Sequence, residues 1–337
     1  MNTHSLPVAL TMGEPAGIGG ELTLMVWRRR VDAGLPVFFV IDWPQRLAAL
    51  ARRLGWDLPI EAIADPEQAQ GVFDHALPVL PTTDAVAGVA GKPDPGQGRA
   101  VLESIDRAVI LTRQGRAAAI VTNPIQKSVL YDAGFGFPGH TEYLAHLAGI
   151  ATEPVMMLEG GGVRVVPVTI HIALKDVAGA LTQSAIIHCS RVAAAALRRD
   201  FGIARPRLTI AALNPHAGEQ GAFGREEIDI IAPAVKALQD EGIDAVGPAP
   251  ADTLFHQQAR SGFDAAICMY HDQALIPLKT LDFDTGVNIT LGLPFVRTSP
   301  DHGTALSLAG TGRANPASLI QALRSAAQLA ARRRAAA

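Results

Sequence analysis

The chain has 337 residues, of which 48% are hydrophobic and 18% are charged, and its formal net charge at pH 7 is −3. This length predicts about two domains, and this much apolar material excludes wholesale disorder. The near-neutral charge argues against nucleic-acid binding, and the two cysteines exclude a disulfide-stapled scaffold and a Cys-based zinc finger. With neither a run of about 20 apolar residues nor a basic, apolar leader, we expect a cytoplasmic protein that does not contact membranes.

Short β-branched, apolar runs alternate along the chain with longer Ala/Leu-rich stretches. The runs predict strands at residues 8–12, 37–41, 118–122, 163–170, 208–213, 265–269 and 287–290. The stretches predict helices at residues 19–31, 44–54, 97–113, 184–199, 226–241 and 316–332. Strands that are apolar on both faces are typical of parallel sheets covered by helices. The alternation therefore predicts an α/β fold with a largely parallel sheet.

Polar residues gather where the predicted strands end. The segments concerned read TMGEPAG, TNPIQK, TIHIALKD, ALNPHAGE, CMYHDQ and NITLGLP. In open α/β sheets, ligands bind beyond the carboxyl ends of the strands. We therefore expect these segments to converge on one site.

Three histidines occupy matching positions in these segments. His171, His216 and His271 each follow a strand-like run, and Asp272 directly follows His271. Three imidazoles from three strand ends could bind a divalent metal and leave positions open for a substrate. Each could equally be a hydrogen-bonded loop residue, because the sequence alone carries no geometry.

Other strand ends supply candidate anion-binding groups. The segment GHTE, residues 139–142, is able to open a helix with Thr141 as its cap. Together with a helix N-terminus, Lys279 and Arg297 could hold a phosphate or a carboxylate. The alternative for each cation is a surface ion pair.

Two glycine-rich segments bear on cofactor binding. The first, MGEPAGIGG, opens a predicted helix, but its G-x-x-x-G-x-G spacing is not the dinucleotide-binding pattern, and Asp42 is only a loose candidate for the ribose-binding acid. The second, residues 301–316, reads DHGTALSLAGTGRANP and is too polar for a core helix.

Several longer segments follow one another along the chain: TMGEPAGIG, GHTEYLA, NPHAGE with GREEIDIIAP, GPAPADTLF, YHDQALIPLK, GVNITLGLPFVRTSPDHGTA and AGTGRANP. In this order they resemble the 4-hydroxythreonine-4-phosphate dehydrogenase family of vitamin B6 biosynthesis, from about Thr11 to the last helix. Residues 301–316 are also similar to the cofactor loop of the isocitrate and isopropylmalate dehydrogenase group. The resemblance implies two α/β/α subdomains with a cleft between them, approximately residues 1–127 with 283–337, and residues 128–282.

The resemblance also implies roles for individual residues. His171, His216 and His271 would bind a divalent metal (Zn, Mg or Co) shared across a homodimer interface. The substrate-binding residues would be His140, Thr141, Lys279, Asn288 and Arg297. The catalytic or orienting groups would be Lys279, Asp252 and Asp272, and the residues near the cofactor, NAD or NADP, would be His302, Gly303 and Asn315. Gly20, where family members more often carry Pro, departs from the pattern without touching a matched ligand.

The implied reaction oxidises the secondary alcohol of 4-phosphooxy-threonine, and the resulting β-keto acid loses CO2 to give 3-amino-2-oxopropyl phosphate. A free alkoxide near pH 7 would cost about 12 kcal/mol, more than the ~3–5 kcal/mol that a general base contributes. A bound metal can supply an effect of the required size. Four alternatives stay open. Two are a dehydrogenase of a four-carbon sugar-acid phosphate such as threonate or erythronate 4-phosphate, and a three-histidine metal hydrolase. The others are a phosphate acyltransferase and a non-catalytic metal-binding or scaffold protein.

Overall fold

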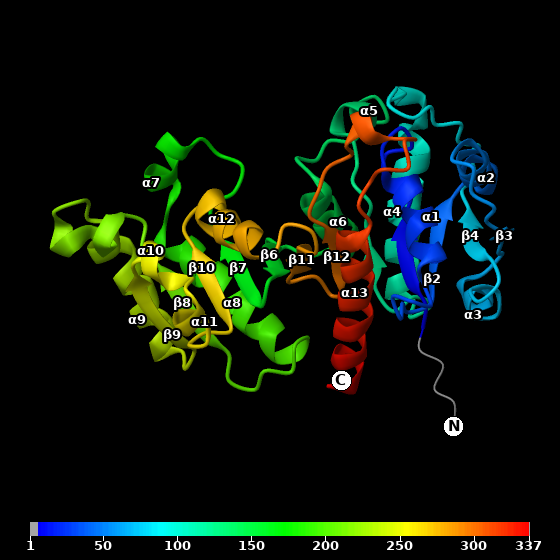
Figure 1. Cartoon of the computed structure of the whole chain (residues 1–337). Coiled ribbons are helices and arrows are strands. Elements are labelled where there is room, and N and C mark those ends of the chain that lie inside the picture. Colours follow the sequence, from blue (N-terminus) through cyan, green and yellow to red (C-terminus); the bar gives the residue numbers. More distant parts are fainter. Residues whose placement is uncertain (1–5, 337) are drawn as a thin grey trace. The chain divides into compact units, whose positions relative to one another are not determined.

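The computed structural model describes residues 6–336 and divides into two units (Figure 1). Unit 1 contains the chain up to residue 153 together with residues 293–334, and unit 2 contains residues 154–292. The predicted α/β class is confirmed, because each unit is a sheet flanked by helices. No helix within residues 6–336 is long and apolar enough to cross a membrane.

The sheet of unit 1 is parallel, with β1 next to β2 and β5. Across the sheet its strands are β3 (Ile60–Ala62), β4 (Leu77–Pro81), β2 (Phe38–Asp42), β1 (Val8–Thr11), β5 (Ile120–Val121) and β12 (Arg297–Pro300). The β1–β2 register pairs Val8 with Phe38 and Thr11 with Ile41. All four residues of β1 and all five of β2 are buried, as expected for strands covered on both faces.

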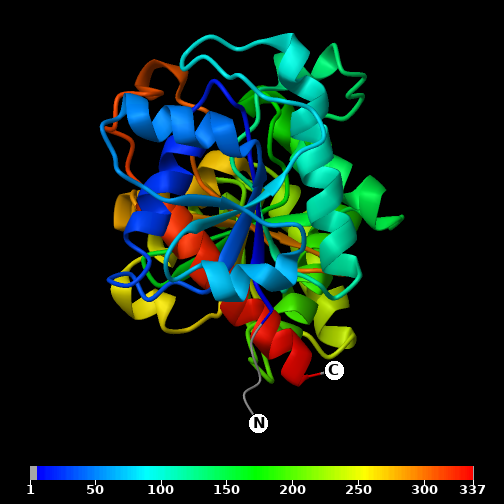
Figure 2. The same cartoon turned by 90° about the vertical axis from the view of Figure 1, so that its right-hand side faces the viewer.

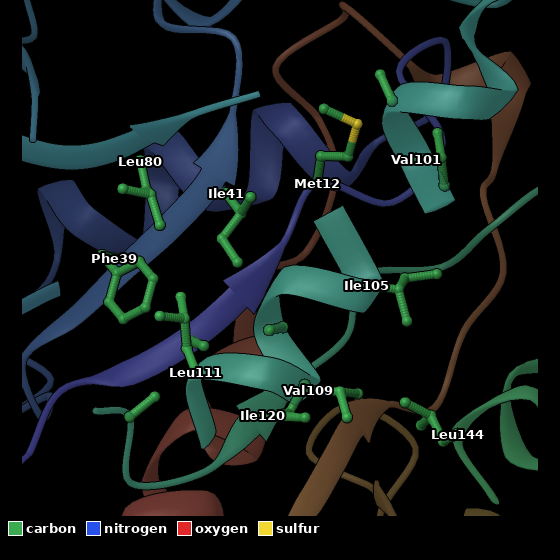
Figure 3. Packing of buried hydrophobic residues seen from close by; sticks show 14 of the residues in the cluster. Met12, Phe39, Ile41, Leu80, Val101, Ile105, Val109, Leu111, Ile120 and Leu144 are labelled. Atoms are coloured by element: carbon green, nitrogen blue, oxygen red, sulfur yellow. The ribbon is translucent and has the colours of Figure 1, made fainter. Parts of the chain in front are cut away.

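Helices cover both faces of this sheet. They are α1 (Gly19–Arg28), α2 (Pro44–Arg53), α3 (Ala69–Val72), α4 (Gly98–Arg113), α5 (Lys127–Tyr131), α6 (His140–Ala148) and α13 (Ala317–Ala335). Figures 1 and 2 show α1 and α13 on one face and α4 on the other. In the core of Figure 3, Ile105 and Val109 of α4 lie with Phe39, Ile41 and Ile120 of the strands. The α4 face therefore anchors the strands whose ends carry the polar segments.

Unit 2 has a mixed sheet. Its strands, in order, are β11 (Val287–Leu291), β6 (Val155–Gly160), β7 (Val163–Pro167), β10 (Ala265–Cys268), β8 (Arg207–Ala211) and β9 (Asp244–Ala249). Strand β6 runs antiparallel to both β7 and β11, whereas β7, β10, β8 and β9 are parallel. The helices are α7 (Val177–Ala180), α8 (Gln183–Arg199), α9 (Ala232–Asp240), α10 (Ala251–Leu254), α11 (Gln257–Arg260) and α12 (His271–Leu281). The parallel run places three strand ends at one edge of the sheet.

Local sequence explains where these helices begin and end. Thr182 caps α8 by accepting a hydrogen bond from the Ala185 amide at 3.1 Å, and Arg198 and Arg199 lie in its last turn. The expected helix over residues 226–241 is wrong in its first part, because residues 227–231 form a π-helical turn before α9. The strands β3, β4, β6, β9 and β12 were not predicted; β12, for example, has the polar sequence RTSP but is fully buried.

Both unit boundaries lie later in the chain than the expected 127/128 and 282/283. Residues 128–153 belong to unit 1 because α5 and α6 pack on α4. Tyr143 of α6 donates a 2.5 Å hydrogen bond to Asp106 of α4, and Leu144 lies in the same core. Residues 287–291 belong to unit 2 because they pair with β6.

Candidate active site

The three matched histidines all belong to unit 2, at the carboxyl ends of neighbouring parallel strands. His171 follows β7, His271 begins α12 directly after β10, and His216 follows β8. Helix α12 packs on β7 and β10, with Ala274 and Leu278 in the core of the unit. The order β7–β10–β8 therefore directs all three segments to one edge of the sheet.

Two of these imidazoles are close together. The ring centroids of His171 and His271 are 6.1 Å apart, and His271 Nδ1 lies 2.7 Å from Asp272 Oδ1. The ring of His216 instead lies 6.3 Å from that of Phe223. Within residues 6–336, no three His, Cys, Asp or Glu side chains are grouped closely enough to hold a metal ion. A single chain thus brings together two of the three expected ligands, and the third lies in the segment that follows the next strand, β8.

His216 lies in an unusual piece of backbone. The residues from His216 to Gln220 all have positive φ, between 41° and 76°. Only glycine adopts this left-handed conformation without strain, and Gly218 is the only glycine among the five. Strained backbone of this kind is concentrated at functional sites.

The remaining candidates of unit 2 lie on three different elements. Asp252 is exposed in α10, and Lys279 in α12 has its Nζ 5.5 Å from the centre of the Phe283 ring. Asn288 lies in β11, and its Oδ1 is buried without a hydrogen-bond partner. An orphaned buried oxygen of this kind is a natural acceptor for a ligand.

The anion-binding candidates of unit 1 meet at the start of α6. This helix begins at His140, with Gly139 rather than Thr141 at the N-cap and no side-chain cap, so the predicted capping role of Thr141 is wrong. Arg297, only 3% exposed, donates from Nε and Nη2 to Thr122 Oγ1 at 3.1 and 2.5 Å. Burial lowers the pKa of Arg297 to about 10, which still leaves it charged at neutral pH.

His140 is held in its neutral form by its surroundings. Burial, and then the nearby Arg297 charge, keep the pKa of His140 well below its usual value of 6.5. Its Nε2 is buried without a hydrogen-bond partner. A buried cation and an imidazole with an unused nitrogen are suited to hold an anionic, hydrogen-bonding group.

The first glycine-rich segment packs against the second. The Ile18 amide donates to the Thr304 carbonyl at 3.0 Å, and a Cβ on Gly13 (φ +67°) would lie 2.6 Å from Asn123 Cβ. Glu21 is fully buried and accepts hydrogen bonds from the amides of Gly310 (2.8 Å) and Ala314 (3.3 Å). The sequence reading missed this residue, although Glu21 lies at the end of the glycine-rich motif.

Asp42, the loose ribose candidate, is already used by the fold. It is buried at the end of β2 and accepts two hydrogen bonds from Arg46, one of them from Nε at 2.9 Å. Arg46 in turn donates from Nη1 to the Pro15 carbonyl at 3.2 Å. The pair therefore fixes the MGEPAG turn, and the ribose interpretation of Asp42 is wrong.

The expected cofactor residues lie in the segment that Glu21 holds, or next to it. His302 Nδ1 is 3.0 Å from the Gly303 carbonyl, and Gly303 is exposed. Asn315 Oδ1 accepts a 3.0 Å hydrogen bond from the Ala317 amide, where α13 begins. The segment is thus fixed by hydrogen bonds near both ends and, at Gly310 and Ala314, by Glu21.

Comparison with known proteins identifies the family of the chain. The family model described as "Pyridoxal phosphate biosynthetic protein PdxA" matches residues 36–326. The chain belongs to the PdxA family. The resemblance seen in the sequence is confirmed.

Several known proteins are similar to this chain over nearly their whole length. A 4-hydroxythreonine-4-phosphate dehydrogenase of Bradyrhizobium diazoefficiens is 52% identical, over 98% of this chain and 99% of that protein. The enzyme of that name from Caulobacter vibrioides is 53% identical, over 98% and 99% of the two chains. The crystal structure of the Klebsiella pneumoniae enzyme of that name superposes with a TM-score of 0.87 at 38% identity, covering 97% of this chain and 100% of that one.

The matched residues of this PdxA family member are divided between its two units. His140, Thr141, Arg297, His302, Gly303 and Asn315 belong to unit 1. His171, His216, Asp252, His271, Asp272, Lys279 and Asn288 belong to unit 2. Unit 1 therefore contains the expected cofactor residues and three of the expected substrate residues, and unit 2 contains the expected metal ligands together with Lys279 and Asn288.

Proposed function

We propose that the chain oxidises the C3 hydroxyl of 4-hydroxythreonine 4-phosphate with NAD or NADP in the formation of pyridoxal phosphate. The hydroxyl loses a proton and a hydride, and the hydride passes to the nicotinamide ring. The ketone formed lies β to the carboxylate, so CO2 leaves and a proton returns to carbon. The products are 3-amino-2-oxopropyl phosphate, CO2 and the reduced cofactor. The observation that carries this proposal is the pair of adjacent imidazoles, His171 and His271, in a chain of the PdxA family.

The three histidines at the sheet edge supply the donor atoms that a divalent metal needs. Neutral imidazoles are common ligands of zinc and related ions, and Asp272 is placed to orient His271. When bound, such an ion supplies Lewis acidity, which lowers the pKa of water from about 15.7 to about 7 and acts in the same direction on an alcohol. His171, His216 and His271 would hold the ion.

Exposed apolar side chains support a homodimer, in which a second copy of the chain completes the set of metal ligands. Leu174, Phe223, Ile276 and Phe283 are 72%, 52%, 63% and 76% exposed, and each lies within twelve residues of one of the histidines. Exposed apolar side chains that form one patch mark an interface, and the proposal places these four in the contact between two copies of the chain. In this homodimer, the metal ligands would come from both subunits.

The family resemblance assigns several residues to the anionic groups of the substrate. Arg297 supplies a buried positive charge, and His140, neutral at pH 7, supplies a hydrogen-bonding nitrogen. Thr141 lies in the first turn of α6, where backbone N–H groups point toward an anion. Lys279 and Asn288 would complete the set, with Lys279 or Asp252 moving the proton between the hydroxyl and solvent.

The cofactor would bind against residues 302–315. Its glycines permit close approach of the backbone, and the buried Glu21 carboxylate fixes the amides of Gly310 and Ala314. The open spacing of MGEPAGIGG agrees with a nicotinamide site that does not use the usual dinucleotide loop. His302, Gly303 and Asn315 would lie next to the cofactor.

A spectrophotometric assay tests the proposal. Reduction of NAD and NADP is followed with 4-hydroxythreonine 4-phosphate and with threonate 4-phosphate in parallel, before and after treatment with a chelator. We expect reduction with the first substrate, its loss on chelation and its return with Zn2+, Co2+ or Mg2+. His216→Ala should abolish metal-dependent turnover in a folded protein. Exclusive turnover of threonate 4-phosphate would assign the sister activity, and no cofactor reduction with either substrate would refute the dehydrogenase.

A further inference from the structure

The His216 segment needs support from outside itself. His216 and Ala217 have φ of 53°, Glu219 of 41° and Gln220 of 56°, and all four carry a side chain. Side chains make this left-handed conformation unfavourable, so the segment keeps it only where the surrounding structure determines it. Within the segment's own turn, the bonds are long: the amides of Ala222 and Phe223 donate to the carbonyls of Glu219 and Gly218, each at 3.2 Å.

The support comes from one buried carboxylate. Glu227 is 3% exposed, and its Oε1 accepts hydrogen bonds from the backbone amides of Leu213 (2.9 Å) and Asn214 (2.7 Å). Its Oε2 accepts a third bond from Asn214 Nδ2 at 2.9 Å. These donors lie between β8 and His216, so Glu227 fixes the backbone at the point where the chain leaves the strand.

The segment around His216 packs closely against Glu227 and Asn214. A Cβ on Gly218 would lie 2.5 Å from Glu227 Oε2, and a Cβ on Gly224 would lie 2.5 Å from Asn214 Nδ2. The left-handed segment therefore passes directly over the carboxylate. All three groups that Glu227 contacts are N–H donors, so only an acceptor with two oxygens satisfies them.

We propose that Glu227 is a positioning residue for His216, through which it sets the affinity of the metal site. The proposal rests on the proposed function, in which His216 is a metal ligand. A glutamine at this position would present one oxygen and one NH2 group. The NH2 group would face another donor, and the segment that carries His216 would lose its fixed conformation.

Titration of the metal-free, full-length protein with Co2+ tests this proposal, with visible absorption of the bound ion and calorimetry as readouts. Glu227→Gln should weaken Co2+ binding by about ten- to a hundredfold, the usual effect of removing a group that orients a metal ligand. It should also change the visible spectrum of the saturated protein. In His216→Ala/Glu227→Gln, the affinity should equal that of His216→Ala alone, because Glu227 acts through His216.

Asp264→Asn is the matched control. Asp264 also accepts a backbone hydrogen bond, from the Arg207 amide at 2.8 Å, but it lies where β8 and β10 begin rather than where they end. It should lower the melting temperature without changing Co2+ affinity or spectrum. Asn214→Ala, which removes only the side-chain bonds to Glu226 and Glu227, replaces Glu227→Gln if that variant does not fold, with a smaller loss of affinity in the same direction.

The outcomes separate the two proposals. If His216→Ala weakens Co2+ binding but Glu227→Gln binds as the wild type does, the positioning role is refuted and the metal site stands. If the two losses multiply in the double variant, or Asp264→Asn gives the same loss, Glu227 acts through general stability and the proposal is overturned. If His216→Ala binds Co2+ as tightly as the wild type, His216 is not a ligand, and both proposals fail.

Discussion

The buried carboxylate of Glu21 gives the sharpest test of the cofactor segment. Glu21 accepts hydrogen bonds from the amides of Gly310 and Ala314, which lie in the segment expected to bind the nicotinamide cofactor. In Glu21→Gln one oxygen remains, so one amide loses its acceptor and faces an NH2 group instead. A hydrogen bond to a charged group contributes about 1.5–3 kcal/mol, and this is the expected cost of ordering the segment in the variant.

At about 1.4 kcal/mol per factor of ten, this cost corresponds to roughly a ten- to hundredfold weaker binding of the cofactor. The KM for NAD or NADP should rise by this factor, while kcat at saturating cofactor should change little, because Glu21 is buried beneath the segment. Steady-state kinetics measure both constants. Fluorescence gives an independent titration, since a Cβ on Gly312 would lie 3.6 Å from the ring of Trp56.

Ser104→Ala is the control for a loss of stability alone. Ser104 is fully buried in unit 1, accepts from the Met12 amide at 3.1 Å and donates to the Ile41 carbonyl at 2.8 Å. It should lower the melting temperature and leave the KM for the cofactor unchanged. If Glu21→Gln behaves in the same way as Ser104→Ala, residues 310–314 do not bind the cofactor, and the assignment is refuted.

Three further predictions concern unit 1. Arg46→Met should lower the free energy of unfolding by about 3–5 kcal/mol, because it leaves Asp42 buried and unpaired. In urea unfolding, the double variant Asp42→Asn/Arg46→Met should lose clearly less than this. An equal loss in the two variants would refute the pairing. Below about pH 6.5 the unfolded chain binds a proton at His140 that the folded chain does not. The free energy of unfolding should therefore fall by up to about 1.4 kcal/mol for each pH unit below this value. His140→Asn should remove this pH dependence, and an unchanged dependence would contradict the low pKa. Ile105→Ala should cost about 2–5 kcal/mol, measured by the same unfolding; a loss below about 1 kcal/mol would show that Ile105 is not packed as in Figure 3.

The elements with a simple periodic pattern were predictable from the sequence. Strands β1, β2, β8 and β10 are continuous apolar runs, and the structure shortens or shifts their expected ends by a residue or two. Helix α4 has a regular apolar face and begins one residue after its expected start. In these cases local preference and burial agree, so the sequence pattern alone was sufficient.

The sequence did not predict the elements whose conformation depends on residues far away in the chain. β12 reads RTSP, a polar segment, and is a strand because it pairs with β5 and because Arg297 finds Thr122 there. β6 reads VMMLEG without clear alternation and is held as a strand between β7 and β11. The sequence could not show that α6 begins at His140 and not after Thr141, because the start of this helix depends on how α6 packs on α4.

In the candidate site, too, the sequence predicted which residue types are present but not their conformation. Histidines at three strand ends were visible in the sequence, since strand order and polar ends follow from local patterns. The left-handed backbone of His216 was not visible, because HAGEQ, residues 216–220, has a glycine at only one of the five positions that adopt it. The signal that could have revealed it is the glutamate pair of GREEIDIIAP: an acidic side chain at an otherwise apolar helix start needs donors, and the buried Glu227 finds them in the residues just before His216. Glu21 in unit 1 likewise uses its buried carboxylate to accept hydrogen bonds from the backbone amides of a segment far along the chain, those of Gly310 and Ala314.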